Sequence, residues 1–220
     1  MGIRIYKPTT PGRRHTSVET FEEVTAKSTL RRKLVVKNRT GGRNNQGKIT
    51  VRHHGGGAKQ FYRLIDFKQD KFDIPGVITA VEYDPNRTVR IAAVTYADGD
   101  KRYILLVEGL AVGSQVLSSR QTIKPAVGVR MPLELIPLGE MVCNIELTPG
   151  KGGAMIRSAG GAAQLMAVEG KFAQLKLSSG EVRLVPKTCL ATIGQLAGQH
   201  RRNIRIGKAM FNISFYVNFL

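Results

Sequence analysis

Lysines and arginines stand beside glycines in two stretches of this chain, a combination suited to close contact with phosphate groups. In the first stretch, Gly42, Gly47 and Lys48 have the Walker A spacing Gly-x-x-x-x-Gly-Lys. A nucleotide-hydrolysing loop would next need a hydroxyl for Mg²⁺ and a helix whose N-terminus meets the phosphates. Position 49 is isoleucine, and the β-branched residues 49–51 predict a strand. We therefore interpret this stretch as a basic glycine loop that lies along phosphates rather than as a site of nucleotide hydrolysis.

The second stretch, residues 151–161, presents Lys151 and Arg157 among glycines and alanines. These small residues remove side-chain bulk where the two cations are presented, as close contact with a nucleic-acid backbone requires. A free loop of this composition would have a high cost in conformational entropy. We therefore predict that Lys151 and Arg157 bind phosphates.

Two other features could carry chemistry but have simpler interpretations. His53 and His54 suggest a metal site or a general base, yet neighbouring residues of an extended segment point in opposite directions. We interpret them as polar contacts in a basic loop. Arg87 follows the turn 84–86, where a solvated arginine and a functional one are equally expected. The sequence offers no set of acid, base and nucleophile that could form an active site. We therefore predict that the protein is not an enzyme and has no metal site and no cofactor.

The charge of the chain indicates an acidic partner. It has 34 Lys and Arg against 16 Asp and Glu, a formal net charge of +18. The first 68 residues hold sixteen of these cations and only four of the acids, and they have almost no apolar periodicity. Such a segment cannot bury a core of its own and is expected to be extended and poorly ordered without a polyanion. Nucleic acid is favoured over an anionic membrane surface or an acidic protein, because its backbone supplies closely spaced phosphates.

The cysteines and the apolar segments bear on the compartment. Cys143 and Cys189 form no CxxC pair and have apolar neighbours, so we expect two reduced, buried thiols rather than a disulfide or metal site. A reducing compartment fits them best. The chain starts without a signal-peptide core, and its longest apolar run, 209–220, is shorter than the roughly 18 residues of a membrane span. We expect no membrane partner and no small-molecule substrate.

From about residue 59 onward, apolar and polar residues alternate between turn signals, a pattern typical of an all-β sandwich or barrel. Residues 188–197 admit a short helix or turn. A stretch rich in Pro, Gly and Val near 121–132 marks the predicted break between two β units. The predicted strands are 77–83, 89–96 and 102–107, with a hairpin turn at 97–100, and then 141–147, 164–168, 173–177 and 181–185.

A series of motifs runs in one order from residue 1 to about 208. They are YKPTTPGRR (6–14), GGRNNQGKIT (41–50), RHHGGG (52–57), YRLIDFK (62–68), EYDPNR (82–87), DGDKRYIL (98–105), PGKGG (149–153), RSAG (157–160) and SGEVR (179–183). With these motifs the chain closely resembles the L2 family of large-subunit ribosomal proteins in its bacterial or organellar form. The resemblance implies an OB-fold barrel (59–127) followed by an SH3-like barrel (128–199), with a basic extended N-terminal segment (1–58) and a tail (200–220).

The resemblance also implies a function. It indicates binding to large-subunit ribosomal RNA, neighbouring ribosomal proteins as partners, a role in subunit association and a place near the peptidyl-transferase centre. The compartment would be the cytoplasmic ribosome of a bacterium, or a plastid or mitochondrial ribosome. By motif, Arg87 and Arg157 correspond to the main RNA contacts of the two barrels. The candidate RNA-binding residues are Arg13, Arg14, Arg43, Lys48, Arg52, His53, His54, Lys59, Arg63, Lys68, Arg87, Arg102, Lys151 and Arg157.

The chain departs from the family pattern at its end. Family members continue past the motif at 206–209 with a long basic extension that carries a His-Pro-His-Gly-Gly-Gly stretch, whereas residues 209–220 here have no charged side chain. We therefore expect a truncated tail, to which no role of that histidine carries over. The alternative function is an RNA-binding regulatory module outside the ribosome. Finding the chain in mature ribosomes, or failing to find it there, separates the two.

Overall fold

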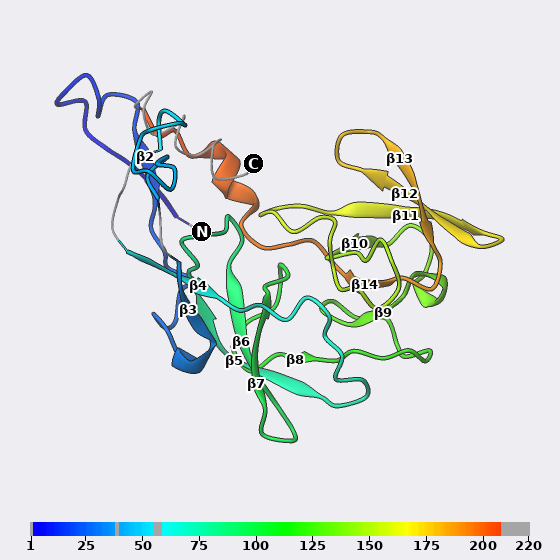
Figure 1. Cartoon of the computed structure of the whole chain (residues 1–220). Helices are drawn as coiled ribbons and strands as arrows, with labels where there is room; N and C mark the ends of the chain where they lie inside the picture. Colours follow the sequence, from blue (N-terminus) through cyan, green and yellow to red (C-terminus); the bar gives the residue numbers. More distant parts are fainter. Residues whose placement is uncertain (1, 38–39, 55–58, 208–220) are drawn as a thin grey trace.

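The computed structural model describes residues 2–37, 40–54 and 59–207, and within these ranges the chain is almost entirely β (Figure 1). Its helical turns there are the short 3-10 segments η1 (Arg31–Lys33), η2 (Leu133–Leu135) and η3 (Gln199–Asn203). None of the helices in these ranges is long and apolar enough to cross a membrane. The strands form two main antiparallel sheets and two smaller strand pairs.

The first main sheet has the strand order β7-β6-β5-β8. Its strands are β5 (Gly76–Glu82), β6 (Ile91–Tyr96), β7 (Lys101–Leu105) and β8 (Gln115–Val116). Both faces of β6 are covered, since Ala92 and Val94 belong to one apolar cluster while Ile91 and Ala93 belong to another. The sheet curls into an OB-like barrel, which confirms the fold predicted for this part of the chain. The strands and the hairpin predicted here are confirmed to within a few residues.

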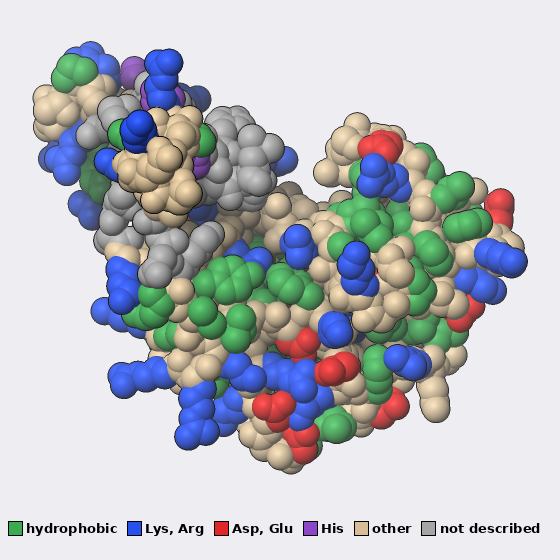
Figure 2. All heavy atoms as spheres, in the orientation of Figure 1, with side chains coloured by type: hydrophobic (Ala, Val, Ile, Leu, Met, Phe, Trp, Pro, Cys, Tyr) green, Lys and Arg blue, Asp and Glu red, His purple; other side chains and the backbone are tan. Residues whose placement is uncertain are grey.

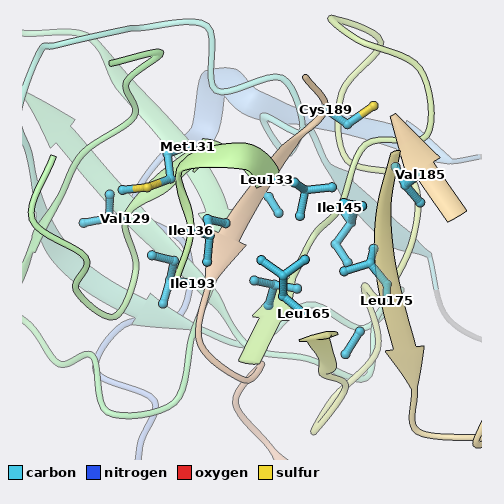
Figure 3. Close-up of a cluster of buried hydrophobic side chains, with 14 residues drawn as sticks. Val129, Met131, Leu133, Ile136, Ile145, Leu165, Leu175, Val185, Cys189 and Ile193 are labelled. Carbon is cyan, nitrogen blue, oxygen red and sulfur yellow. The ribbon is translucent and has the colours of Figure 1, made fainter. Parts of the chain in front are cut away.

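The second main sheet has the order β13-β12-β11-β10-β14-β9 and curls into the SH3-like barrel. Alternating residues of its strands meet in one apolar cluster, in which Leu165, Leu175 and Ile145 are fully buried (Figure 3). The sheets lie within 59–127 and 128–199, and the domain boundaries themselves stay predictions. The strands are β9 (Arg130–Pro132), β10 (Met141–Cys143), β11 (Ala163–Glu169), β12 (Phe172–Leu177), β13 (Val182–Pro186) and β14 (Leu190–Ile193).

Two predictions in this barrel are wrong in detail. Residues 188–197 contain strand β14 instead of a helix or turn. All four of its residues are buried. The sequence therefore lacks the alternation of apolar and polar residues that marks a half-exposed strand. The strand predicted over 141–147 ends at Cys143, because Asn144 adopts a left-handed backbone conformation with φ of 49°.

The basic N-terminal segment is more structured than its composition predicts. Its residues form β1 (Ile3–Ile5), which pairs with β2 (Ser17–Glu19), and β3 (Leu34–Lys37). β3 pairs with β4 (Gln60–Arg63), which lies just beyond the segment. Thr25 binds the first barrel, since its amide donates to the Val81 carbonyl (3.0 Å) and its Oγ1 accepts from the Val81 amide (2.9 Å). The Leu30 amide donates to the Tyr103 hydroxyl (3.0 Å). The expectation that the segment is extended and poorly ordered without a polyanion does not describe residues 25–37. They dock on the first barrel through these hydrogen bonds and through Ala26 and Leu30, which pack against an apolar cluster.

The segment after the second barrel returns to the N-terminal strand pair. The Ser17 amide donates to the Arg205 carbonyl, and the Arg205 amide donates to Ser17 Oγ, both at 2.8 Å. The adjoining η3 carries Arg201 and Arg202. Lys and Arg side chains gather on the lobe around β2 (Figures 1 and 2).

The prediction of two buried, reduced cysteines is confirmed. Cys143 and Cys189 are both buried and form no disulfide. Burial raises the pKa of the Cys143 thiol to about 12 and that of Cys189 to about 11. Both side chains pack in apolar clusters, so their role in the fold is that of small hydrophobic residues.

Candidate nucleic-acid interface

An open groove of about 520 Å³ lies where the two barrels meet. The first barrel contributes the turn after β5, residues 86–88, and the second contributes residues 154–158. Ser178 and Ser179, in the turn between β12 and β13, complete the wall. The two arginines that family resemblance singles out, Arg87 and Arg157, therefore face the same hollow from different barrels.

Arg157 is exposed, and no carboxylate in the described ranges forms an ion pair with it. Its Cζ lies 4.8 Å from the centroid of the Phe67 ring. The preceding Ile156 has φ of 56°, a left-handed conformation that a β-branched residue rarely adopts. Strain of this kind persists only where the surroundings impose it, and it is concentrated at functional sites. Here it accompanies the backbone turn that presents Arg157 at the groove.

Arg87 is held by the protein itself. Its Nη2 donates to the Tyr62 hydroxyl (2.7 Å), its Nε lies 3.3 Å from Asp84 Oδ2, and its Cζ is 5.1 Å from the Phe67 ring centroid. Asp84 also caps the turn, accepting the Asn86 amide at 2.9 Å. Because the Arg87 side chain is only 15% exposed, the interpretation as a freely solvated arginine is wrong.

A buried ion pair supports the glycine loop that carries Lys151. Arg130 Nη2 lies 3.2 Å from Glu146 Oε1, and both side chains are almost completely buried. Glu146 also accepts the amides of Gly150 and Gly152, each at 3.1 Å. Burial lowers the pKa of Arg130, and the Glu146 carboxylate opposes that effect. The exposed Lys151 is thus presented on a loop whose backbone is fixed from beneath.

The absence of a side chain at Gly153 is a steric requirement of this loop. A Cβ at this position would lie 2.0 Å from Asn144 Oδ1. The Gly153 amide donates to the Phe67 carbonyl at 2.8 Å, which joins the loop of the second barrel to the first barrel. Gly153 therefore allows close contact between the barrels.

The basic loop at 40–54 is compact and exposed. Asn44 Oδ1 accepts the amides of Gln46 and Lys48, both at 3.0 Å, and a single bridge joins Arg43 to Ile49. The strand expected at 49–51 is reduced to that bridge, and no helix follows within residues 49–54, so the phosphate-binding geometry of a Walker A loop is not formed there. His53 has φ of 64°, so the premise that the two histidines lie in an extended segment is wrong. No cluster of metal-ligating side chains occurs in the described ranges.

Two family models match the chain. One, described as "Ribosomal Proteins L2, RNA binding N-terminal domain", covers residues 31–118. The other, described as "Ribosomal Proteins L2, C-terminal domain", covers residues 126–216. The chain belongs to the ribosomal protein L2 family. The match extends past 208, into residues that the motifs alone did not relate to L2 and that lie outside the described ranges.

Besides Arg87, two more of the basic residues predicted to bind RNA in this L2-family chain are engaged by carboxylates. Arg63 is 9% exposed and lies within ion-pair distance of Glu82 and Asp84 (3.9 and 3.7 Å). Arg102 bonds Asp66, Asp70 and Asp100. Hydrogen bonds from Arg102, and then from Lys71, lower the pKa of Asp100 to about 2. The geometry gives Arg63 and Arg102 structural roles within the first barrel, and their RNA contacts stay predictions.

The other predicted contacts are spread over the surface of the L2 chain. Arg13, Arg14, Lys59 and Lys68 are exposed, as are Arg43, Lys48, Arg52, His53, His54 and Lys151. Sequence reasoning missed two residues near the groove. Arg202, in η3, lines a hollow next to the groove. In the sequence, the dibasic pair 201–202 could have pointed to it. Phe67 contacts both groove arginines. In the sequence, its position as an aromatic residue beside Lys68 in a basic segment could have pointed to it.

Proposed function

We propose that this L2-family chain is a structural constituent of the large ribosomal subunit that binds large-subunit ribosomal RNA across the groove between its barrels. The observation that carries the proposal is the convergence of Arg87 and Arg157 on one ring at that groove, each within about 5 Å of its centroid. Guanidinium groups bind phosphate oxygens in a planar, bidentate geometry. The basic N-terminal lobe adds sequence-independent attraction to the RNA backbone.

The proposal also covers the role in the ribosome, the partners and the site residues. Binding at a junction of two barrels would fix the local path of the RNA, which is how such a chain would support subunit association and assembly of the peptidyl-transferase centre. Neighbouring ribosomal proteins are the second class of partner. The site residues remain those predicted from the sequence, with Arg87, Arg157, Lys151 and the exposed basic residues of the N-terminal segment as the principal phosphate contacts.

A competition experiment tests the proposal. Labelled large-subunit ribosomal RNA is bound to the purified chain and displaced by unlabelled large- or small-subunit ribosomal RNA at physiological salt. We expect the large-subunit RNA to compete at a concentration about a hundredfold lower, since specific nucleic-acid contacts exceed non-specific binding by orders of magnitude. Equal displacement by both RNAs would indicate a charge-driven binder without the proposed specificity.

A further inference from the structure

Phe67 occupies the point where the two barrels and the two groove arginines meet. Its ring centroid lies 5.1 Å from Arg87 Cζ and 4.8 Å from Arg157 Cζ. Its carbonyl accepts the amide of Gly153 at 2.8 Å and Nη2 of Arg130 at 3.5 Å. Phe67 precedes β5 in the first barrel, whereas three of these four partners belong to the second.

The ring has an electrostatic effect on the pair of arginines. Since one Cζ is 5.1 Å and the other 4.8 Å from the same centroid, the two Cζ atoms are less than about 10 Å apart. That separation is comparable with the Debye length, about 8 Å at physiological ionic strength, so their mutual repulsion is only partly screened. The negative face of an aromatic ring attracts guanidinium groups and offsets such repulsion.

The two arginines differ in what else holds them. Arg87 has Asp84 and Tyr62 as further partners. Arg157 has no ion pair within the described ranges, so the Phe67 ring is its defined side-chain contact. Loss of the ring would therefore leave Arg87 near its place and release Arg157 into solvent, where a long side chain samples many rotamers.

We infer that Phe67 is a positioning residue that holds Arg157 beside Arg87, so that the two guanidinium groups act as one phosphate-binding element spanning both barrels. This inference rests on the proposed function of the groove. Pre-ordering Arg157 lowers the entropic cost of binding, which is how a residue without a phosphate contact raises RNA affinity.

Phe67 also packs at the edge of an apolar cluster formed by Val89, Leu105 and Leu196, so a purely structural role must be distinguished. Phe67→Leu keeps an apolar side chain there but removes the ring, and Phe67→Tyr keeps the ring. A matched control is Phe72→Leu, because Arg120 Cζ lies 4.4 Å from the Phe72 ring and neither residue lines the groove.

The test measures affinity for deproteinised large-subunit ribosomal RNA in a double-substitution cycle with Arg157→Ala. We expect Phe67→Leu to weaken binding about fivefold, and Phe67→Tyr and Phe72→Leu to stay within about twofold of wild type. We also expect Arg157→Ala to weaken binding, and the double variant Phe67→Leu/Arg157→Ala to bind within about twofold of Arg157→Ala alone.

Two outcomes overturn the inference. Wild-type affinity of Phe67→Leu, while Arg157→Ala binds weakly, shows that the ring does not position the arginine. Strictly additive losses in the double variant show that Phe67 acts only through packing. If Phe67→Leu unfolds, Phe67→Met is measured in the same cycle. Wild-type affinity of Arg157→Ala is a different result, because it refutes the proposed RNA site itself and, with it, the role of Phe67.

Discussion

Replacement of Arg130 by alanine is expected to lower the free energy of unfolding by about 3–5 kcal/mol, the range observed when one member of a buried ion pair is removed. Arg130 and Glu146 have side-chain exposures of 0% and 1%. Without Arg130, the carboxylate stays buried without its cation, and the carbonyl of Asn144 loses its 2.8 Å hydrogen bond from Nη1. Chemical denaturation followed by circular dichroism measures the loss.

The second barrel offers a control on the same chemistry. Arg183 and Glu181 form an exposed pair, with exposures of 51% and 54%, so Arg183→Ala should change stability by less than about 1 kcal/mol. An apolar replacement of both buried partners should not restore stability, because Glu146 also accepts the amides of Gly150, Gly152 and Leu190. If Arg130→Ala proved as mild as Arg183→Ala, the assigned structural role of the pair would be wrong.

The Arg87→Ala variant should combine a loss of stability with a loss of RNA affinity. Asp84 is completely buried and, among the residues that the structure describes, would retain only the more distant Arg63, 3.7 Å away, as a cation partner. We expect destabilisation of about 1–3 kcal/mol, the cost of leaving a buried polar group poorly paired. The measurement is thermal or chemical unfolding, with RNA affinity determined at a temperature where the variant is fully folded.

Arg157→Ala is the matched comparison, since Arg157 is exposed and has no ion pair in the described ranges. Its stability should stay within about 0.5 kcal/mol of wild type, as is usual for surface substitutions. Equal destabilisation by the two substitutions would contradict the difference in burial on which this prediction rests.

The parts of the fold that could be predicted from the sequence are those in which one face of a strand is buried. Ala173 and Leu175 alternate with Gln174 and Lys176, so β12 was evident from its period of two. β14 is buried along its whole length and carries no such signal. The docking of residues 25–37 depends on contacts with Val81 and Tyr103, more than fifty residues away, and no local pattern encodes them.

The candidate site shows the same division. The exposure of Lys151 and Arg157 could be predicted because small residues surround them locally, while their phosphate contacts stay predictions. The carboxylates that engage Arg63 and Arg102 come from other strands and turns, so only the fold reveals that these two arginines are held inside the protein. The shared contact with Phe67 likewise requires the two barrels to be assembled, because Arg157 lies far from it in sequence.

The salt dependence of RNA binding tests the central claim most directly, namely that the groove between the barrels binds phosphates. The slope of log Kobs against log salt concentration is measured for wild type, for Arg157→Ala and for Arg183→Ala as a cation outside the groove. Loss of one phosphate contact should reduce the slope of Arg157→Ala by about 0.7–0.9 and lower its affinity, while Arg183→Ala retains the wild-type values. A slope and affinity for Arg157→Ala that match wild type would contradict the proposed interface.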